Sequence, residues 1–263
     1  MPIKKLSEPS FIRPAEIMGG DIQAALLVKA EEIASMIATG VGQRSGNILE
    51  EARAKVSKIY KKAGLPEANR ARLVRIMNEG ANEVSDADAL RLARPRLNKI
   101  LDNVEGAVQK SADRYLDRIV LKKVAKIIAA GGSKADVEIS VIKSMGDAEA
   151  YWKNVSNTAT SRMFHYGSML AAQSSGLTKC EYHAVIDSVT TDFCRAIDGQ
   201  VRSLANVIKK AEDALEQTSD EMLNTTFWAM AEQMGDEGSL ALVSNGITLP
   251  PFHGHCRTTT QFY

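Results

Sequence analysis

The sequence predicts a mainly α fold, in which a helical N-terminal region is followed by a small α+β module at the C-terminal end. Three observations lead to this prediction. Apolar residues recur at helical spacing through most of the 263 residues. Aromatic residues make up only 5% of the chain, which is low for the pleated faces of a β-sandwich or barrel. Strand-like stretches and tight-turn residues gather only after about residue 179.

Composition narrows the class of protein further. Hydrophobic residues make up 44% and charged residues 25%, which is typical of a globular chain and argues against disorder throughout. A net charge of +1 argues against coating of nucleic acid through bulk charge. We expect no targeting segment and no bilayer span, since no apolar run approaches the ~20 residues that a span needs. Three cysteines fit a reducing compartment better than a disulfide-stapled fold.

The first half of the chain is expected to be helical after an extended arm over residues 1–20, which are rich in Pro and Ser. Helix starts are indicated by capping residues, and helix ends by Gly and Pro. We expect helices over 21–39, from Asn47 to Gly64, over 68–78 with an end at Gly80, from Ser85 to Pro95, and over 96–130.

The middle of the chain holds two further helix signals. Ser133 and Asp136 form a potential capping box after Gly131. A long helix is expected over 148–175, with Gly176 as the residue that ends it. We therefore divide the chain into a helical region, 1–145, and a module, 146–263.

The module mixes both kinds of element. Residues 179–187 have strand-like content, and Asp198 with Gly199 predicts a tight turn between short strands. Helical spacing returns over 204–217 and 220–234, so a helical insertion is expected over about 203–245. A β-rich stretch follows over 258–263.

Two segments about 60 residues apart carry most of the residues suited to a functional site. The first runs from Asp187 to Gly199 and the second from Pro250 to Arg257. Together they resemble the signature of the phage Mu F-like minor head morphogenesis family, over about residues 148–263. The matching positions are Asp187, Thr190, Cys194, Asp198, Gly199, Pro250, Pro251, His253, Cys256 and Arg257.

The resemblance implies a structural role. It implies a minor capsid or head morphogenesis protein that binds the portal or the inner capsid wall during procapsid assembly. The implied partners are portal, major capsid or scaffolding protein, with packaged DNA as a further candidate and no membrane in the assembled head. The implied location is the capsid interior or portal vertex, and the host cytoplasm during assembly. A protein ejected with the genome, or a neck component, is the alternative within a virion.

The chain departs from the family pattern at two cysteine positions, which here are Thr191 and Thr258. In members that keep all four cysteines, the resemblance implies a metal clip or paired thiols. Zinc normally takes four Cys, His or carboxylate ligands. If zinc binds here, Cys194, His253 and Cys256 are the candidates, with His255 or Asp187 completing the set. We favour buried, structural roles for these residues and expect no cofactor.

An enzyme is the alternative from another functional class. Cys194 or Cys256 with His253 or His255 could form a nucleophile and base, with Asp187 or Asp192 orienting the imidazole. A metal-dependent hydrolase or nuclease could use the same residues. No phosphate-binding glycine loop and no His-Glu-x-x-His motif is present, so we predict a protein that is not an enzyme.

The most basic stretch runs from Arg91 to Lys126, with ten basic residues against four acidic ones. One interpretation is a solvated helix face, and the other is a surface that contacts packaged DNA or an acidic protein. The candidate contacts are Arg114, Arg118, Lys122 and Lys123. For the module, we expect the two motif segments to meet, with Cys194 and Cys256 in one cluster and His253 beside them. We also expect Arg257 to pair with Asp187 or Asp198.

Overall fold

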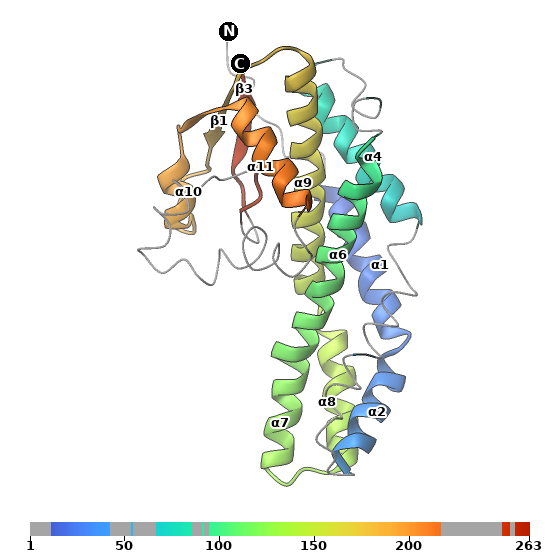
Figure 1. Cartoon of the computed structure of the whole chain (residues 1–263). Coiled ribbons are helices and arrows are strands. Elements are labelled where there is room, and N and C mark those ends of the chain that lie inside the picture. The colour runs from blue at the N-terminus through green and yellow to red at the C-terminus, as the bar shows by residue number, and fades with distance from the viewer. Residues whose placement is uncertain are drawn as a thin grey trace. The chain divides into compact units, whose positions relative to one another are not determined.

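The computed structural model describes residues 12–42, 67–85, 95–216, 249–252 and 256–263, together with residues 54 and 91. In these residues the chain is mainly helical and carries a small antiparallel sheet toward the C-terminus (Figure 1). The predicted fold class is therefore confirmed. The helices expected from Asn47 and after Ser85 are described only at residues 54 and 91, which are helical. The helix expected over 220–234 and most of the predicted insertion lie outside the described residues.

The helices begin and end close to local sequence signals. In chain order they are α1 (Ile12–Leu27), α2 (Ala30–Gly42), α4 (Glu67–Asn82), α6 (Leu97–Tyr115), η1 (Leu116–Val120), α7 (Leu121–Ala129), α8 (Lys134–Gly146), α9 (Glu149–Ser174), α10 (Asp192–Ile197) and α11 (Leu204–Glu216). The π-helical turn η1 joins α6 to α7, so these three form the long helix predicted over 96–130. None of the described helices has the length and apolar character needed to cross a bilayer.

The N-terminal arm predicted over 1–20 is wrong for residues 12–20, which belong to α1. Pro14 is tolerated there because the first turn of a helix needs no backbone N–H donor at that position. Ala15, Met18 and Ile22 lie on one face of α1 and are buried. The free energy gained by burying that face stabilises the helix even though the segment is rich in proline and serine. The helix predicted over 21–39 is in fact split between α1 and α2 by a turn at residues 28–29.

Two predicted helix boundaries in the middle of the chain are confirmed. The Ser133 hydroxyl accepts a hydrogen bond from the Asp136 N–H at 3.2 Å, and the Asp136 carboxylate accepts one from the Ser133 N–H at 2.7 Å. This reciprocal capping box starts α8. Gly176 has a φ of +72° just after α9, a conformation that only glycine adopts without strain.

Gly80 does not end a helix, contrary to the prediction, but lies inside α4. A Cβ atom at Gly80 would lie 2.0 Å from the Phe164 carbonyl oxygen of α9. A Cβ atom at Gly167 of α9 would lie 1.8 Å from the Met77 carbonyl oxygen of α4. The Ser168 hydroxyl donates to the Gly80 carbonyl at 2.8 Å. The two helices thus cross in backbone contact, and this contact explains the mid-helix glycine.

The chain divides into two compact units, each assembled from separate stretches. One unit combines the described residues of Met1–Ala15, Ala68–Val104 and Asn157–Tyr263, and the other those of Glu16–Glu67 and Glu105–Ser156. Both α6 and α9 contribute to each unit. The predicted boundary between 1–145 and 146–263 stays a prediction.

The second unit is a helical bundle in which α8 packs against α2, η1 and α7 (Figure 1). Its core includes a group of aromatic side chains: the rings of Tyr115 and Tyr151 lie 4.8 Å apart, and Tyr151 meets Trp152 edge-on at 5.2 Å. The Tyr151 hydroxyl donates to the Ser111 carbonyl at 2.7 Å. Aliphatic residues complete this core, among them Ile33, Ile37, Val120, Val124, Val137 and Val141.

The first unit contains the sheet, formed by β1 (Lys179–His183), β2 (Val201–Ser203) and β3 (Thr259–Phe262). Among the described residues the strand order is β2-β1-β3, and both pairings are antiparallel. Glu181 of β1 stands opposite Val201 on one side and Gln261 on the other. The strand predicted in 179–187 is confirmed for residues 179–183, and the β-rich end for residues 259–262. The register places the C-terminal segment beside β1, the first strand of the module.

The Asp198–Gly199 turn differs from the prediction, because it joins helix α10 to β2 and not two strands. The residues before the turn are helical because the Thr191 hydroxyl caps α10, accepting from the Cys194 N–H at 3.3 Å. Gly199 has a φ of +72°, and its N–H donates to the Tyr182 carbonyl at 2.8 Å. The turn therefore ties the end of α10 to the central strand.

Candidate functional site

The two motif segments meet in the first unit, as predicted. The Cys194 Sγ atom lies 3.9 Å from the Cys256 Sγ atom, across 62 residues of sequence. The Arg257 Nη2 atom donates to the Asp187 Oδ2 atom at 2.5 Å. Of the two partners predicted for Arg257, Asp187 is thus the one it contacts. These contacts join the loop after β1 to the segment that leads into β3.

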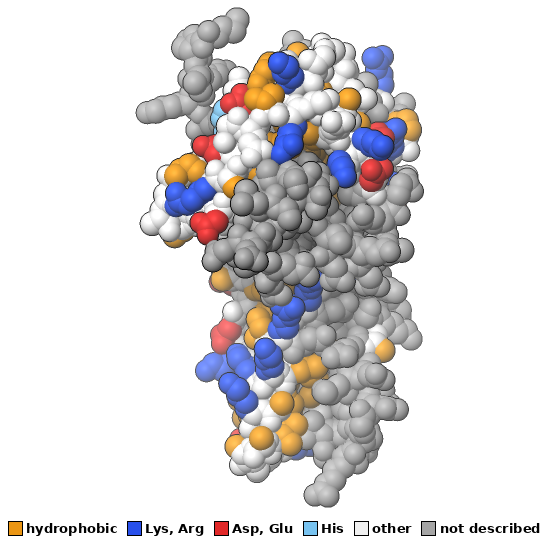
Figure 2. All heavy atoms as spheres, turned by 60° about the vertical axis from the view of Figure 1, so that its left-hand side comes forward, with side chains coloured by type: hydrophobic (Ala, Val, Ile, Leu, Met, Phe, Trp, Pro, Cys, Tyr) orange, Lys and Arg blue, Asp and Glu red, His pale blue; other side chains and the backbone are white. Residues whose placement is uncertain are grey.

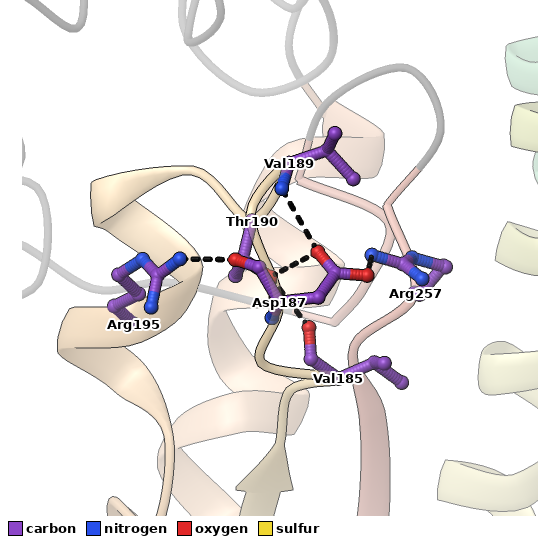
Figure 3. Close-up of polar contacts among 6 residues, drawn as sticks. All are labelled: Val185, Asp187, Val189, Thr190, Arg195 and Arg257. Carbon is purple, nitrogen blue, oxygen red and sulfur yellow. Dashed lines mark hydrogen bonds and ion pairs between the residues drawn. The ribbon is translucent and has the colours of Figure 1, made fainter.

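Asp187 organises the loop between β1 and α10 (Figure 3). Its Oδ1 atom accepts the Val189 N–H at 3.0 Å and lies 2.9 Å from the Thr190 hydroxyl. The Thr190 hydroxyl accepts the Asp187 N–H at 2.7 Å and also lies 2.7 Å from the Val185 carbonyl oxygen. The Arg195 guanidinium donates to the Asp187 carbonyl. Residues 185–190 are consequently held in one closed turn.

The contacts of Asp187 stabilise its negatively charged form. Hydrogen bonds from Arg257 and Thr190 lower the pKa of the Asp187 carboxyl to about 2 from an ordinary value of 3.8. The Asp187 and Arg257 side chains retain 38% and 47% of their exposure, so solvent screens the ion pair. The pair therefore orients the loop more than it stabilises the fold.

The closed turn presents three apolar side chains to solvent. Val185 is 50% exposed, Ile186 48% and Val189 76%. We call these three residues the apolar tip. β-branched side chains on a loop fixed by hydrogen bonds lose little conformational freedom on contact with another surface. The apolar tip is therefore suited to binding another protein surface.

The Asp198–Gly199 turn also contacts the loop between β1 and α10. The Asp198 Oδ1 atom accepts the Ala184 N–H at 2.8 Å, where the chain leaves β1. The Asp198 N–H donates to the Cys194 carbonyl at 3.2 Å, which completes the C-terminal end of α10. Asp198 is therefore a turn residue that anchors the start of the loop.

Both threonines that stand at cysteine positions of the family pattern contact Cys194. The Thr191 hydroxyl accepts from the Cys194 backbone, as described above, and the Thr258 hydroxyl donates to the Cys194 Sγ atom at 3.3 Å. Thr258 and Cys194 are both buried. The four positions of the pattern thus remain one cluster, in which two thiols and two hydroxyls surround the start of α10.

The prolines of the second motif segment lie within the core of the module. Pro250 and Pro251 are buried beside Leu249. The ring of Phe252 lies 5.2 Å from that of Phe193 in α10 and 5.9 Å from that of Tyr182 in β1. This segment therefore packs the sheet against α10. His253 and His255, which follow it, lie outside the described residues.

His165 of α9 lies beside the cluster, although it belongs to neither motif segment. His165 is buried, and its Nδ1 atom lies 3.3 Å from the Thr260 hydroxyl of β3. Burial lowers the pKa of His165 to about 4, while the nearby Cys256 acts in the opposite direction and Arg162 adds to the lowering. The buried Arg162 donates to the Pro251 carbonyl at 3.4 Å, and burial lowers its pKa to about 9. A polar Arg-x-x-His spacing on a buried helix face is the signal that could have identified this pair.

The chemistry available to this cluster is limited. The hydrogen bond with Cys256 and burial both raise the pKa of the Cys194 thiol above its ordinary value, which disfavours a thiolate nucleophile. The Asp187 carboxylate, a candidate to orient a catalytic imidazole, is engaged by Arg257 and the loop. Within the part of the chain that the structure describes, no three His, Cys, Asp or Glu side chains converge as metal ligands. Of the candidate zinc ligands, Cys194, Cys256 and Asp187 are described, whereas His253 and His255 lie outside the described residues.

A separate basic surface lies on the second unit. Arg114, Arg118, Lys122 and Lys126 follow one another at four-residue intervals along α6, η1 and α7, with Lys123 beside them. We call these five residues the basic ridge. Helix α7 carries three lysines and no acidic residue in its sequence, and Figure 2 shows Lys and Arg side chains gathered there. Lys123 also donates to the Ser144 hydroxyl of α8 at 3.1 Å, so part of the ridge supports the fold.

No family model matches this chain, and the comparisons with curated proteins and with solved structures found no match.

Proposed function

We infer that this chain is a structural protein of a phage head, similar to the Mu F-like minor head proteins, which binds the portal or inner capsid during procapsid assembly. The observation that carries this proposal is that residues of the motif bind one another. Asp187 contacts Arg257, Cys194 contacts Cys256, and the Asp198 N–H donates to the Cys194 carbonyl. Motif residues that hold a fold together suit an assembly protein better than an enzyme.

The apolar tip supports the same proposal. It offers three exposed β-branched side chains on a loop whose shape Asp187 and Thr190 fix. Exposed apolar residues with this degree of order are typical of protein interfaces. In our proposal the tip contacts a portal or capsid subunit, and the basic ridge contacts packaged DNA or an acidic surface of the same assembly.

The direct test is quantitative mass spectrometry of particles purified from the source that encodes the chain. We expect the chain in procapsids and in mature particles, in few copies. Retention after DNA release would place it at the capsid wall or portal, and loss with the DNA would favour the ejected alternative. Absence from both kinds of particle would contradict the proposal.

A surface variant tests the role of the tip. Val189→Asp places a charge at a position that is 76% exposed, so we expect an unchanged melting temperature but reduced incorporation into particles. Ile139→Asp on α8 is the matched control, because Ile139 is also β-branched and 64% exposed. Equal incorporation of the two variants would remove the tip from the interface.

A further inference from the structure

Cys194 and Cys256 form a dithiol pair that joins the two motif segments. Cys194 lies in α10, and Cys256 lies in the irregular segment just before β3. Their Sγ atoms are 3.9 Å apart, whereas a disulfide bond needs about 2.05 Å. Formation of the bond therefore requires the two sulfur atoms to approach each other by about 1.9 Å.

The two thiols differ in accessibility. Cys194 is buried and contacts the Thr258 hydroxyl, whereas Cys256 is partly exposed. A dissolved reagent can therefore reach Cys256 first. The third cysteine, Cys180, is fully buried in β1, where burial raises the pKa of its thiol to about 12. Cys180 is thus a protected thiol and a natural internal control.

We propose that Cys194 and Cys256 are an oxidation site, at which a small-molecule disulfide such as glutathione disulfide closes an intramolecular disulfide bond. The Cys256 thiolate attacks one sulfur of glutathione disulfide, forms a mixed disulfide and releases one glutathione. Because Cys256 then belongs to a mixed disulfide, its thiol no longer raises the pKa of Cys194 through a hydrogen bond. The Cys194 thiol loses its proton to the alkaline solution, and its sulfur attacks the Cys256 sulfur and releases the second glutathione. Two cysteine sulfurs are oxidised, glutathione disulfide is reduced, and the two thiol protons leave with the two glutathiones.

The bond would restrain the module at the point where its segments meet. It would close a loop of 62 residues that includes β2 and α11. Closing a long loop stabilises a fold mainly by restricting the unfolded chain. The oxidised protein should therefore keep its fold and unfold at a higher temperature. This inference concerns the isolated chain and does not rest on the proposed function.

The test uses the full chain, reduced and treated with a metal chelator, and then incubated with glutathione disulfide at mildly alkaline pH. Free thiols are alkylated, and intact mass and peptide mapping identify the products. We expect a mass lower by two hydrogens, a Cys194–Cys256 linked peptide, and a melting temperature several degrees higher that reverts with dithiothreitol.

Three variants make the result specific. Cys180→Ala should still form the bond. Cys256→Ser should leave Cys194 largely unmodified, because Cys194 is buried. Cys194→Ser should stop at a stable glutathione adduct on Cys256, since no second thiol can displace it. Melting curves of the reduced variants check that each is folded.

Three results would overturn the proposal. They are an adduct on Cys256 of the unaltered chain that never resolves, a bond that involves Cys180, and a stoichiometric metal ion that survives chelation and blocks oxidation. The first two would mean that the thiols do not pair as the geometry requires. The third would assign the pair to metal binding.

Discussion

At the scale of single residues, Asp187 links the loop after β1 to α10 and to the segment before β3. Its side chain contacts Val189, Thr190 and Arg257, and its backbone contacts Arg195. Since both Asp187 and Arg257 remain partly exposed, their main effect is on the order of the loop and less on global stability. A substitution at Asp187 should therefore change the order of the loop more than the stability of the whole protein.

We predict that Asp187→Asn loosens the loop with only a small loss of melting temperature. Amide hydrogen exchange should quicken at Val189, whose N–H donates to the carboxylate. Because the folded pKa of about 2 lies below the ordinary 3.8, the carboxylate stabilises the fold above about pH 4. This contribution is lost as the pH falls toward 2, and the variant should lack that loss. Unchanged exchange at Val189 would contradict the role of Asp187.

His165 predicts a pH dependence in a different window. Its folded pKa of about 4 lies below the ordinary 6.5, so between these values the unfolded chain binds a proton that the folded chain does not. Stability should therefore fall as the pH is lowered from 6.5 to 4, by at most about 3 kcal/mol. Denaturant unfolding of the protein and of His165→Gln across this range checks the prediction. The same slope in both proteins would show that His165 is not responsible.

At the scale of elements, the crossing of α4 and α9 depends on two glycines. We predict that Gly167→Ala destabilises the protein by about 3 kcal/mol, since its Cβ would lie 1.8 Å from the Met77 carbonyl oxygen. Gly20→Ala in α1 is the control. A Cβ there meets nothing within 4 Å, and alanine favours a helix. Chemical denaturation measures the free energy of unfolding of both variants. An unchanged free energy of unfolding in Gly167→Ala would mean that the helices do not cross so closely.

The basic ridge is an element-scale feature because a continuous run of α6, η1 and α7 carries it. If the ridge binds packaged DNA, Lys122→Glu should weaken binding of a short DNA duplex and flatten its dependence on salt. Lys134→Glu on α8 is the control, as Lys134 lies 3.9 Å from Glu138 and outside the ridge. Fluorescence anisotropy at several salt concentrations measures this. Equal binding by both variants would favour the solvated-face interpretation.

At the scale of the whole molecule, the chain combines a helical unit that carries the basic ridge and a mixed unit that carries the motif cluster. The proposed contacts fall on both: the ridge on the helical unit and the apolar tip on the mixed unit. The helical insertion predicted over about 203–245 carries neither proposed contact, and most of it lies outside the described residues. The tip was missed because Val185, Ile186 and Val189 look like ordinary strand residues in sequence.

Local residue patterns were enough to predict the features that depend on neighbours within about four residues. The capping box of Ser133 and Asp136 and the glycine end of α9 are of this kind, since each signal and the hydrogen bonds it makes lie in one turn of chain. The two motif segments could also be identified from the sequence, and their joint match led to the expectation that they meet.

Contacts between residues far apart in the chain could not be predicted in this way, because they depend on how the elements pack. Gly80 stays inside α4 because the backbone of α9 lies against it, and this contact has no local signal. Arg257 pairs with Asp187 and not with Asp198, across 70 residues. His165 of α9 joins the cluster because β3 packs over it. Such contacts depend on how faces of separate elements pack, and the free energy of burial that selects them is a property of the whole core.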